Sequence, residues 1–226
     1  MKILPHLLCA TVVLTFAPAF TPAAEPAATP ERAIELCDGR SLQGWTFVSK
    51  DPTADAAAIW SVQDGVIRCT GKPNGYARTV ARYRDYALHV EWRWPAAAGN
   101  SGVFVHVSGV DKVWPTCLEV QLKATDAGSI RANGGSRVAE LNPTAKDPVN
   151  VAHREPASEK PVGEWNACDV ICRGDTVTVT INGVRQNHVT AASVTSGAIA
   201  LQAEGAPVEF RNIVVRPLPA GAPAKP

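Results

Sequence analysis

Acidic, basic and imidazole side chains occur at alternate positions in three consecutive segments of the chain, residues 86–94, 102–109 and 118–124. Alternate side chains of an extended strand point to the same face of a sheet. If the apolar side chains of these segments face a core and the segments pair in chain order, the remaining side chains share the opposite face. That face would carry Glu91, Arg93, His106, Glu119, Gln121 and Lys123.

The alternative is an ordinary solvent-exposed face, on which opposite charges pair across strands. Two features favour a site. Residues 175–181, DTVTVTI, have the Thr-rich pattern of an ordinary face, whereas the three segments carry Glu, Arg, His and Gln, which transfer protons and bind sugar hydroxyls. Residues 124–163 are rich in Gly, Pro and charge with little periodicity, which is typical of a lid or binding loop. The polar face would therefore lie in a cleft.

The elements that must position these residues are short strands. Period-two alternation recurs along the chain, no window keeps a long helical period, and turn residues separate the alternating segments. Asp64-Gly65 and Asn182-Gly183 predict two tight hairpins, because these dipeptides tolerate positive φ angles. Further strands are expected at residues 86–94, 102–109, 118–124, 166–174, 197–205 and 208–218. About ten such strands predict an all-β jelly-roll sandwich of two antiparallel sheets.

Composition limits the partners of the protein. The 226 residues carry 22 Lys and Arg against 21 Asp and Glu, a formal net charge of +1. Nucleic acids and anionic membranes recruit proteins through net basic fields. We therefore expect neither as a partner, and the sequence does not indicate an oligomeric state.

The chain ends differ in composition from the middle. Residues 1–24 combine Lys2, a short apolar run and small residues at plausible cleavage sites, which predicts a signal peptide and a secreted or periplasmic protein without a membrane anchor. The folded domain is expected over residues 33–218 and a flexible Pro/Ala/Gly tail over 219–226. Five cysteines remain after the signal; on one strand Cys168 and Cys172 would lie roughly 13 Å apart, too far to bond to each other.

Several segments resemble a known family. They include LCDGRSLQGW, GNSGVFVH, VWPTCLEVQL, GEWNACDVICRGDTVTVTINGV and SGAIALQAEGAPVEFRNIVVRPL, together with WSVQDGVIRCTGKPNGYARTVARYRDYALHVEWRW. These segments are similar to the 3-keto-disaccharide hydrolase domain family, and the resemblance covers essentially the whole expected domain. It implies a concanavalin A-like fold and action on sugars oxidised at the 3-hydroxyl.

The resemblance implies a specific chemistry. A ketone acidifies the neighbouring C–H bond, so a base can remove that proton, the aglycone can leave by elimination, and water can then add. Glu119 or His106 would be the base, with Arg93 and Lys123 stabilising the enolate. Glu91 with Glu119 would be the pair of an ordinary glycosidase, which needs two carboxyls at a set spacing.

The remaining candidates would bind substrate. Asn100 and Gln121 would hold hydroxyls, and Trp114 would either stack on a sugar ring or plug a loop. Lys123 and Glu204 stand where many relatives have Asp and His, and both are assigned to binding.

Two alternatives stay open at this point. The same jelly roll could be a carbohydrate-binding module without turnover, because a fold does not fix a function. We predict no cofactor; a divalent metal held by His106 and Glu119 is the alternative, although no spaced ligand motif supports it.

Overall fold

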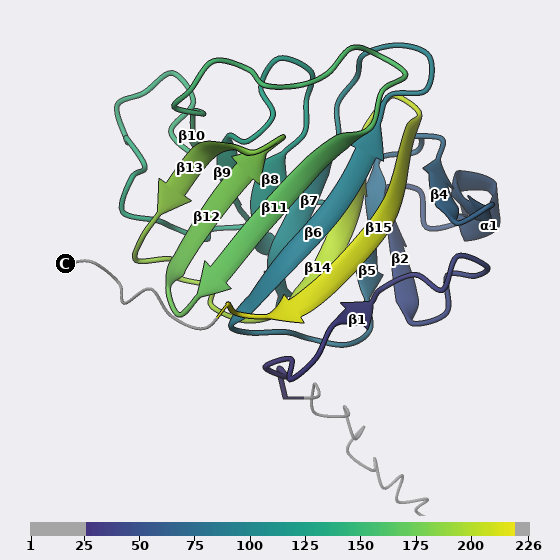
Figure 1. The fold of residues 1–226 in the computed structure, drawn as a ribbon, viewed down its shortest axis with the longest axis horizontal. Coiled ribbons are helices and arrows are strands. Elements are labelled where there is room, and N and C mark those ends of the chain that lie inside the picture. Colours follow the sequence, from purple (N-terminus) through teal and green to yellow (C-terminus); the bar gives the residue numbers. More distant parts are fainter. Residues whose placement is uncertain (1–25, 220–226) are drawn as a thin grey trace, which may run out of the picture.

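The computed structural model describes residues 26–219, which form two antiparallel sheets packed face to face (Figure 1). The β6 sheet has the order β13 (Val184–Val189), β12 (Thr176–Ile181), β11 (Asn166–Arg173), β6 (Tyr86–Arg93), β15 (Val208–Pro217), β4 (Val66–Cys69) and β3 (Trp60–Gln63), with β1 (Ile34–Glu35) paired to β15. The β7 sheet has the order β10 (Asn150–Val151), β9 (Ile130–Asn133), β8 (Thr116–Gln121), β7 (Gly102–Ser108), β14 (Ala198–Ala203), β5 (Gly75–Thr79) and β2 (Trp45–Ser49). Helix α1 (Ala56–Ile59) is a single turn. The all-β sandwich predicted from the alternation is confirmed.

The core lies between the sheets. Every second side chain of β6 is buried, and Leu88, Val90 and Trp92 face the core. The expected hairpins are also present: Asp64 and Gly65 join β3 to β4, Asn182 and Gly183 join β12 to β13, and all four have positive φ. The period-two pattern thus predicted both strands and turns where one face is buried.

The pairing of the first polar strand differs from the prediction. β6 pairs with β11 and β15, not with β7, so residues 86–94 and 102–109 lie in different sheets. Only β7 and β8 pair as expected. Alternation specifies which side chains face a core, but both sheets of a sandwich face the same core. The pattern therefore does not decide which sheet a strand joins.

The outer face of the β7 sheet carries a second, smaller apolar cluster beside its polar side chains. Tyr76 and Phe104 are fully buried there and meet edge to face, with ring centroids 5.7 Å apart. The full cluster contains Tyr76, Phe104, Val107, Cys117, Ala198 and Ala200. Part of this outer face is therefore covered by protein and not by solvent.

The predicted loop at residues 124–163 contains two short strands, β9 and β10, which extend the β7 sheet at one edge. Cys168 and Cys172 are both buried and free, in agreement with the spacing argument. Within residues 26–219 no helix is long and apolar enough to cross a membrane. The predicted signal peptide and the tail after Pro219 lie outside the described residues.

Candidate functional site

A polar cleft of about 470 Å³ opens on the outer face of the β7 sheet. Six of the nine residues singled out in the sequence line it. They are Asn100, Trp114, Glu119, Gln121, Lys123 and Glu204. The cleft also includes Asp126, Arg131, Asn133, Asp147 and Asn150, all from the segment expected to be a loop.

Glu119 is the most buried carboxyl of the cleft. It lies on β8, opposite Phe104 of β7 and Arg131 of β9, and is only 2% exposed. Its Oε2 accepts a hydrogen bond of 2.6 Å from Nδ2 of Asn133. Its Oε1 reaches over Gly102, where an added Cβ would stand 2.8 Å from that oxygen. A glycine on the neighbouring strand therefore makes room for the carboxyl.

The environment of Glu119 favours its neutral form. The pKa of this carboxyl is raised to about 7, chiefly by burial; the charge of Glu204 contributes to the rise, and the hydrogen bond from Asn133 and the charge of Arg131 oppose it. Glu204 is half-buried, and burial raises its pKa above the usual 4.5, opposed by Arg131 and Lys123. Two electrostatically coupled carboxyls thus share one cleft with two cations.

Several polar atoms around these carboxyls have unused hydrogen-bonding capacity. Oδ1 of Asn100 and Oδ1 of Asn150 are buried without a partner in the described residues. Gln121 accepts the backbone N–H groups of Leu122 and Lys123 with its Oε1, which leaves its amide NH₂ free to donate. Buried polar groups are normally satisfied, so orphaned acceptors in a cleft indicate a polar ligand.

Arg131 and Asn133 line the cleft but were not among the candidates singled out from the sequence. Both point outward from β9, while Ile130 and Ala132 are buried against the core. Arg131 pairs with Asp147 at 2.5 Å and so ties β9 to the loop that ends at β10. The alternation of residues 130–133 is a strand signal, but four residues within a long Gly-rich segment are too few to stand out.

His106 is fully buried and not in the cleft, so the prediction that it shares a polar face with Glu119 is wrong. The pairing of β7 with β8 shifts register between Val105 and Ser108, and His106 has a φ of +59°, as expected for a β-bulge. The bulge turns the imidazole into the core, edge-on to Tyr86 at 5.7 Å. Nδ1 contacts the carbonyl of Val194 at 3.0 Å, and burial lowers the pKa of His106 to about 4.

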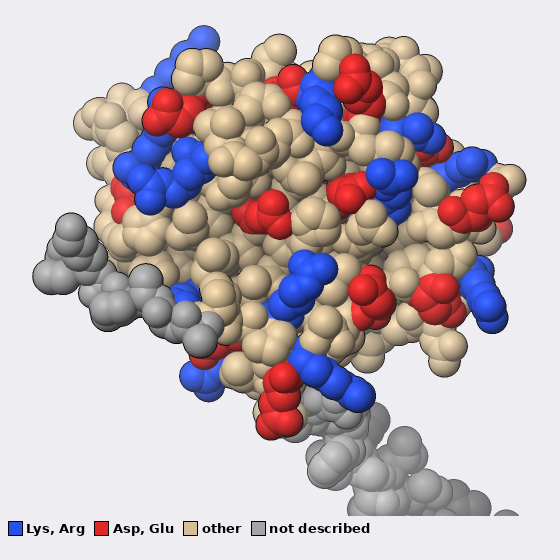
Figure 2. Space-filling view, in the orientation of Figure 1, with Lys and Arg blue, Asp and Glu red and all other residues tan. Residues whose placement is uncertain are grey.

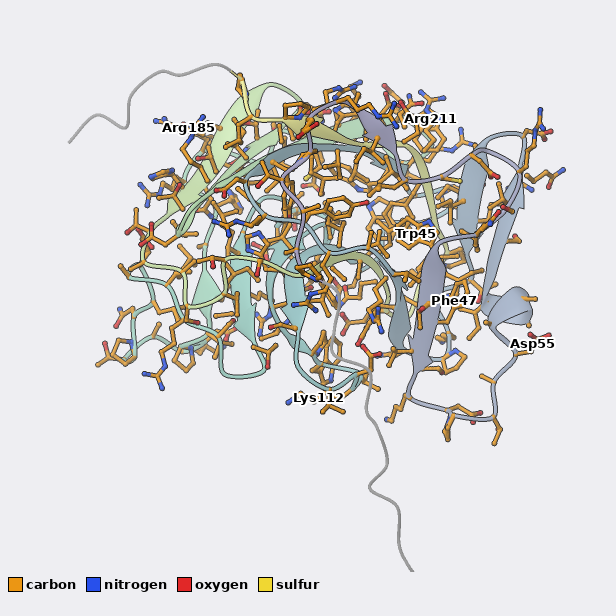
Figure 3. The ribbon with its side chains drawn as sticks, turned by 90° about the horizontal axis from the view of Figure 1, so that it is seen from below. Trp45, Phe47, Asp55, Lys112, Arg185 and Arg211 are labelled. Atoms are coloured by element: carbon orange, nitrogen blue, oxygen red, sulfur yellow. The ribbon has the colours of Figure 1, made fainter. Side chains whose placement is uncertain are left out.

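Glu91 and Arg93 are also absent from the cleft, because β6 belongs to the other sheet. Glu91 accepts a hydrogen bond of 2.6 Å from Nε of Arg211, and Arg93 donates one of 2.6 Å to Glu209. Figure 2 views the molecule from the side of the β6 sheet and shows Lys and Arg beside Asp and Glu over this face. In Figure 3, Arg211 lies outside the β6 sheet and Lys112 lies on the far side of the β7 sheet.

Metal ligation gains no support from side-chain geometry. Among residues 26–219 no group of three or more His, Cys, Asp and Glu side chains is placed to hold a metal ion. The pairing of His106 with Glu119 as metal ligands is wrong, since the bulge puts the imidazole inside the core, edge-on to Tyr86.

The sequence from residue 32 to 216 matches a family model described as the 3-keto-alpha-glucoside-1,2-lyase-like domain. The chain belongs to this family. A comparison with curated proteins gave no match. The lyase-like assignment therefore stands on the family model and agrees with the resemblance found in the sequence.

Solved structures share the fold of this lyase-like domain. Two provisionally named glycosyl hydrolases from Parabacteroides distasonis align with TM-scores of 0.61 and 0.60, at 24% and 18% identity. These alignments cover 84% and 83% of this chain and 95% and 100% of the other chains. The carbohydrate-binding module CBM66 from Bacillus subtilis aligns with a TM-score of 0.54 at 11% identity, over 76% of this chain and 95% of its own. At these identities the likeness shows the fold alone.

Proposed function

We propose that this protein is a secreted enzyme that cleaves the glycosidic bond of 3-keto-glucosides by elimination and subsequent hydration in the cleft of the β7 sheet. The observation that carries the proposal is the placement of the buried Glu119 with the half-buried Glu204 in one polar cleft. Family membership supports the class of substrate, a sugar with a ketone at its 3-position.

The two carboxyls can divide the work of acid and base. Because burial raises the pKa of Glu119 to about 7, this group keeps its proton below neutral pH. Arg131 and Lys123 counteract the raised pKa of Glu204, which favours its ionised form. Paired carboxyls whose surroundings separate their pKa values are a common basis for acid and base roles. Glu119 is therefore assigned as the acid and Glu204 as the base.

The proposed reaction balances with these two groups and water. The Glu204 carboxylate takes the proton from the carbon between the ketone and the anomeric carbon, and the electron pair of that C–H bond forms an enolate. The enolate collapses and expels the glycosidic oxygen, which takes the proton of Glu119. Water then adds to the anomeric carbon of the unsaturated ketone and gives one proton to the Glu119 carboxylate, and protonated Glu204 returns a proton to the neighbouring carbon. The net reaction is hydrolysis.

Cations and amides of the cleft would support these steps. The guanidinium of Arg131 and the ammonium of Lys123 line the cleft and suit the negative oxygen of the enolate. The unpartnered Oδ1 atoms of Asn100 and Asn150 suit sugar hydroxyl donors, and the amide NH₂ of Gln121 suits a hydroxyl acceptor. This assignment gives the orphaned atoms a partner only when a sugar is bound.

Isotope incorporation tests the reaction. Purified protein is incubated with methyl 3-keto-α-glucoside in deuterium oxide, and the released 3-keto-glucose is examined by NMR. Elimination and hydration place one deuterium on the carbon between the ketone and the anomeric carbon. Direct displacement at the anomeric carbon leaves the original hydrogen on that carbon. Samples without protein correct for spontaneous exchange, and Glu35→Gln serves as a matched control because Glu35 is an exposed glutamate on β1.

Each outcome has a clear meaning. Release of deuterated product supports the proposed enzyme. Release without deuterium contradicts elimination. Binding of the sugar without any release supports the alternative of a carbohydrate-binding module and overturns the enzyme.

Secretion is the part of the proposal that rests on residues 1–24 alone. Expression of the whole chain in a bacterium should give a periplasmic or extracellular protein whose N-terminus begins after this segment. Mass spectrometry of the purified protein measures that N-terminus. An intact N-terminus in the cytoplasmic fraction would contradict export.

A further inference from the structure

One loop of the molecule crosses the outer face of the β7 sheet instead of making a short turn. Residues 109–115 join β7 to β8, which are adjacent strands. Nevertheless Asp111 reaches β5, which lies beyond β14 on the other side of β7. Its carboxylate accepts two hydrogen bonds from Arg78, Nε to Oδ1 at 2.9 Å and Nη2 to Oδ2 at 2.7 Å. The hydroxyl of Tyr76 donates a third, of 3.1 Å, to Oδ1.

The anchor of this loop is well defined. Arg78 engages both carboxylate oxygens, a geometry that fixes orientation as well as distance. Tyr76 is fully buried in the small apolar cluster and packs on Phe104, so its hydroxyl presents a fixed donor. The side chains of Arg78 and Asp111 are only 23% and 36% exposed, which limits solvent screening of the pair.

The same loop carries Trp114 to the cleft. Trp114 lies three residues after Asp111, lines the polar cleft and is 43% exposed. Pro115 follows it, and β8 begins at Thr116. The backbone that carries Trp114 is therefore fixed at Asp111 on one side and at the start of β8 on the other. A large aromatic side chain left exposed at the edge of a polar cleft is suited to stacking on the apolar face of a sugar ring.

We propose that Arg78, Tyr76 and Asp111 form a clamp that positions Trp114 as the sugar-stacking platform of the cleft. The clamp residues are positioning residues: they act on sugar affinity through Trp114 and take no part in proton transfer. This inference rests on the proposed function for the identity of the sugar. The clamp would affect sugar affinity from the side of the β7 sheet that lies away from Arg131 and Asn133.

A double-mutant cycle tests the coupling. Trp114→Ala should weaken binding of methyl 3-keto-α-glucoside by roughly 2- to 10-fold, the range expected for one aromatic contact. Asp111→Ala should also weaken binding of the glucoside, which would appear as a higher KM with kcat changed less than about twofold. If the clamp acts through Trp114, Asp111→Ala added to Trp114→Ala has little further effect, because coupled positions are not additive. Asp111→Glu should restore part of the affinity.

The binding readout separates this proposal from the catalytic one. In the Glu119→Gln background the dissociation constant of the same glucoside can be measured by calorimetry, whether or not the parent protein turns it over. Asp169→Ala is the matched control, since Asp169 pairs with His89 at 2.7 Å on the other sheet. Hydrogen exchange of residues 109–115 should rise in Asp111→Ala and stay unchanged in Asp169→Ala.

Three results would overturn the clamp. The first is a loss of affinity in the double variant that equals the product of the losses in Asp111→Ala and Trp114→Ala. The second is a fall in kcat at unchanged KM for Asp111→Ala. The third is unchanged affinity and unchanged hydrogen exchange in Asp111→Ala. Turnover that fails while sugar binding still responds to the clamp would count against the proposed reaction and not against the clamp.

Discussion

The two outer faces of the sandwich carry the same kinds of side chain, but their glutamates differ in pairing. On the β6 sheet Glu209 pairs with Arg68 and Arg93, and Glu91 pairs with Arg211. On the β7 sheet Glu119 has one amide donor. Lys123 takes part in no ion pair within residues 26–219. The β7 sheet has ion pairs of its own, Arg131–Asp147 and Arg78–Asp111, but neither includes Glu119 or Lys123. The glutamates of the β6 sheet are thus paired with arginines, whereas Glu119 in the cleft is not.

Packing reinforces this difference. The guanidinium carbons of Arg93 and Arg211 lie 4.6 and 4.1 Å from the ring centroid of Trp165, so the paired face also holds its cations against an aromatic ring. The cleft instead leaves the Oδ1 atoms of Asn100 and Asn150 buried and unpartnered. Each unpaired buried group opposes folding by about 1–3 kcal/mol. In the proposed function a bound sugar gives these two acceptors their partners.

The strongest test of this comparison measures turnover in two variants, Glu119→Gln and Glu91→Gln. Loss of a general acid lowers turnover by about 10²- to 10⁴-fold. Glu91→Gln should change kcat/KM less than twofold, because Glu91 faces Arg211 on the paired side. Steady-state kinetics on methyl 3-keto-α-glucoside measures both. Equal losses in the two variants would mean that the pairing state does not distinguish a site from a surface.

The pH dependence of kcat/KM sharpens the assignment within the cleft. An acid acts only while protonated, so activity should fall about tenfold per pH unit above the pKa of Glu119, near 7. A base acts only while ionised, so activity should rise with pH through the raised pKa of Glu204. Because Arg131 lowers that pKa, Arg131→Gln should move the acidic limb to higher pH. An acidic limb unmoved by Arg131→Gln would contradict the role of Glu204.

Stability should respond to Glu119→Gln in the opposite direction to activity. The folded-state pKa of Glu119 lies above its usual 4.5, so folding favours the protonated form and ionisation opposes folding. This unfavourable contribution is nearly absent below pH 4.5 and complete above pH 7. The variant should therefore be more stable than the parent by roughly 3 kcal/mol at pH 8 and by little at pH 4.5. Urea unfolding at the two pH values measures the difference; a destabilised variant at pH 8 would contradict it.

His106 should give the reverse pH dependence, although it lies on the adjacent strand. Its folded pKa of about 4 is below the usual 6.5, so the unfolded chain binds the extra proton and stability falls as pH decreases from 6.5 towards 4. Between pH 7.5 and 5 this amounts to about 2 kcal/mol. The parent should lose that much more stability over this range than His106→Asn, as measured by urea unfolding. An equal pH dependence in both proteins would place the imidazole in solvent.

The sequence predicted the sandwich, its two tight hairpins and six of the nine candidate residues that line the cleft. These predictions rest on local alternation, turn chemistry and residue type, and for Glu204 on the family resemblance. The prediction failed at three residues for reasons that are not local. Glu91 and Arg93 lie in the other sheet because strand pairing is set by the whole topology. His106 points inward because of a bulge, and one inserted residue reverses every later side chain of a strand. No pattern within residues 102–109 marks that bulge.

The outer face of the β6 sheet provides the test with the smallest expected effect. Hydrogen bonding to Asp169 raises the pKa of His89, and the charges of Asp169 and Glu91 raise it further while burial opposes them. The stabilisation is therefore complete below the unfolded-state pKa of His and is lost as pH rises through the folded-state value. Asp169→Asn should destabilise the protein by less than about 1 kcal/mol at pH 6, by less still at pH 9, and should leave kcat/KM unchanged, because Asp169 is half-exposed and distant from the cleft. Urea unfolding at both pH values and steady-state kinetics measure these effects. A loss of activity would show that a paired, exposed charge on the β6 sheet is coupled to the cleft, and the two faces would then have to be treated as one functional unit.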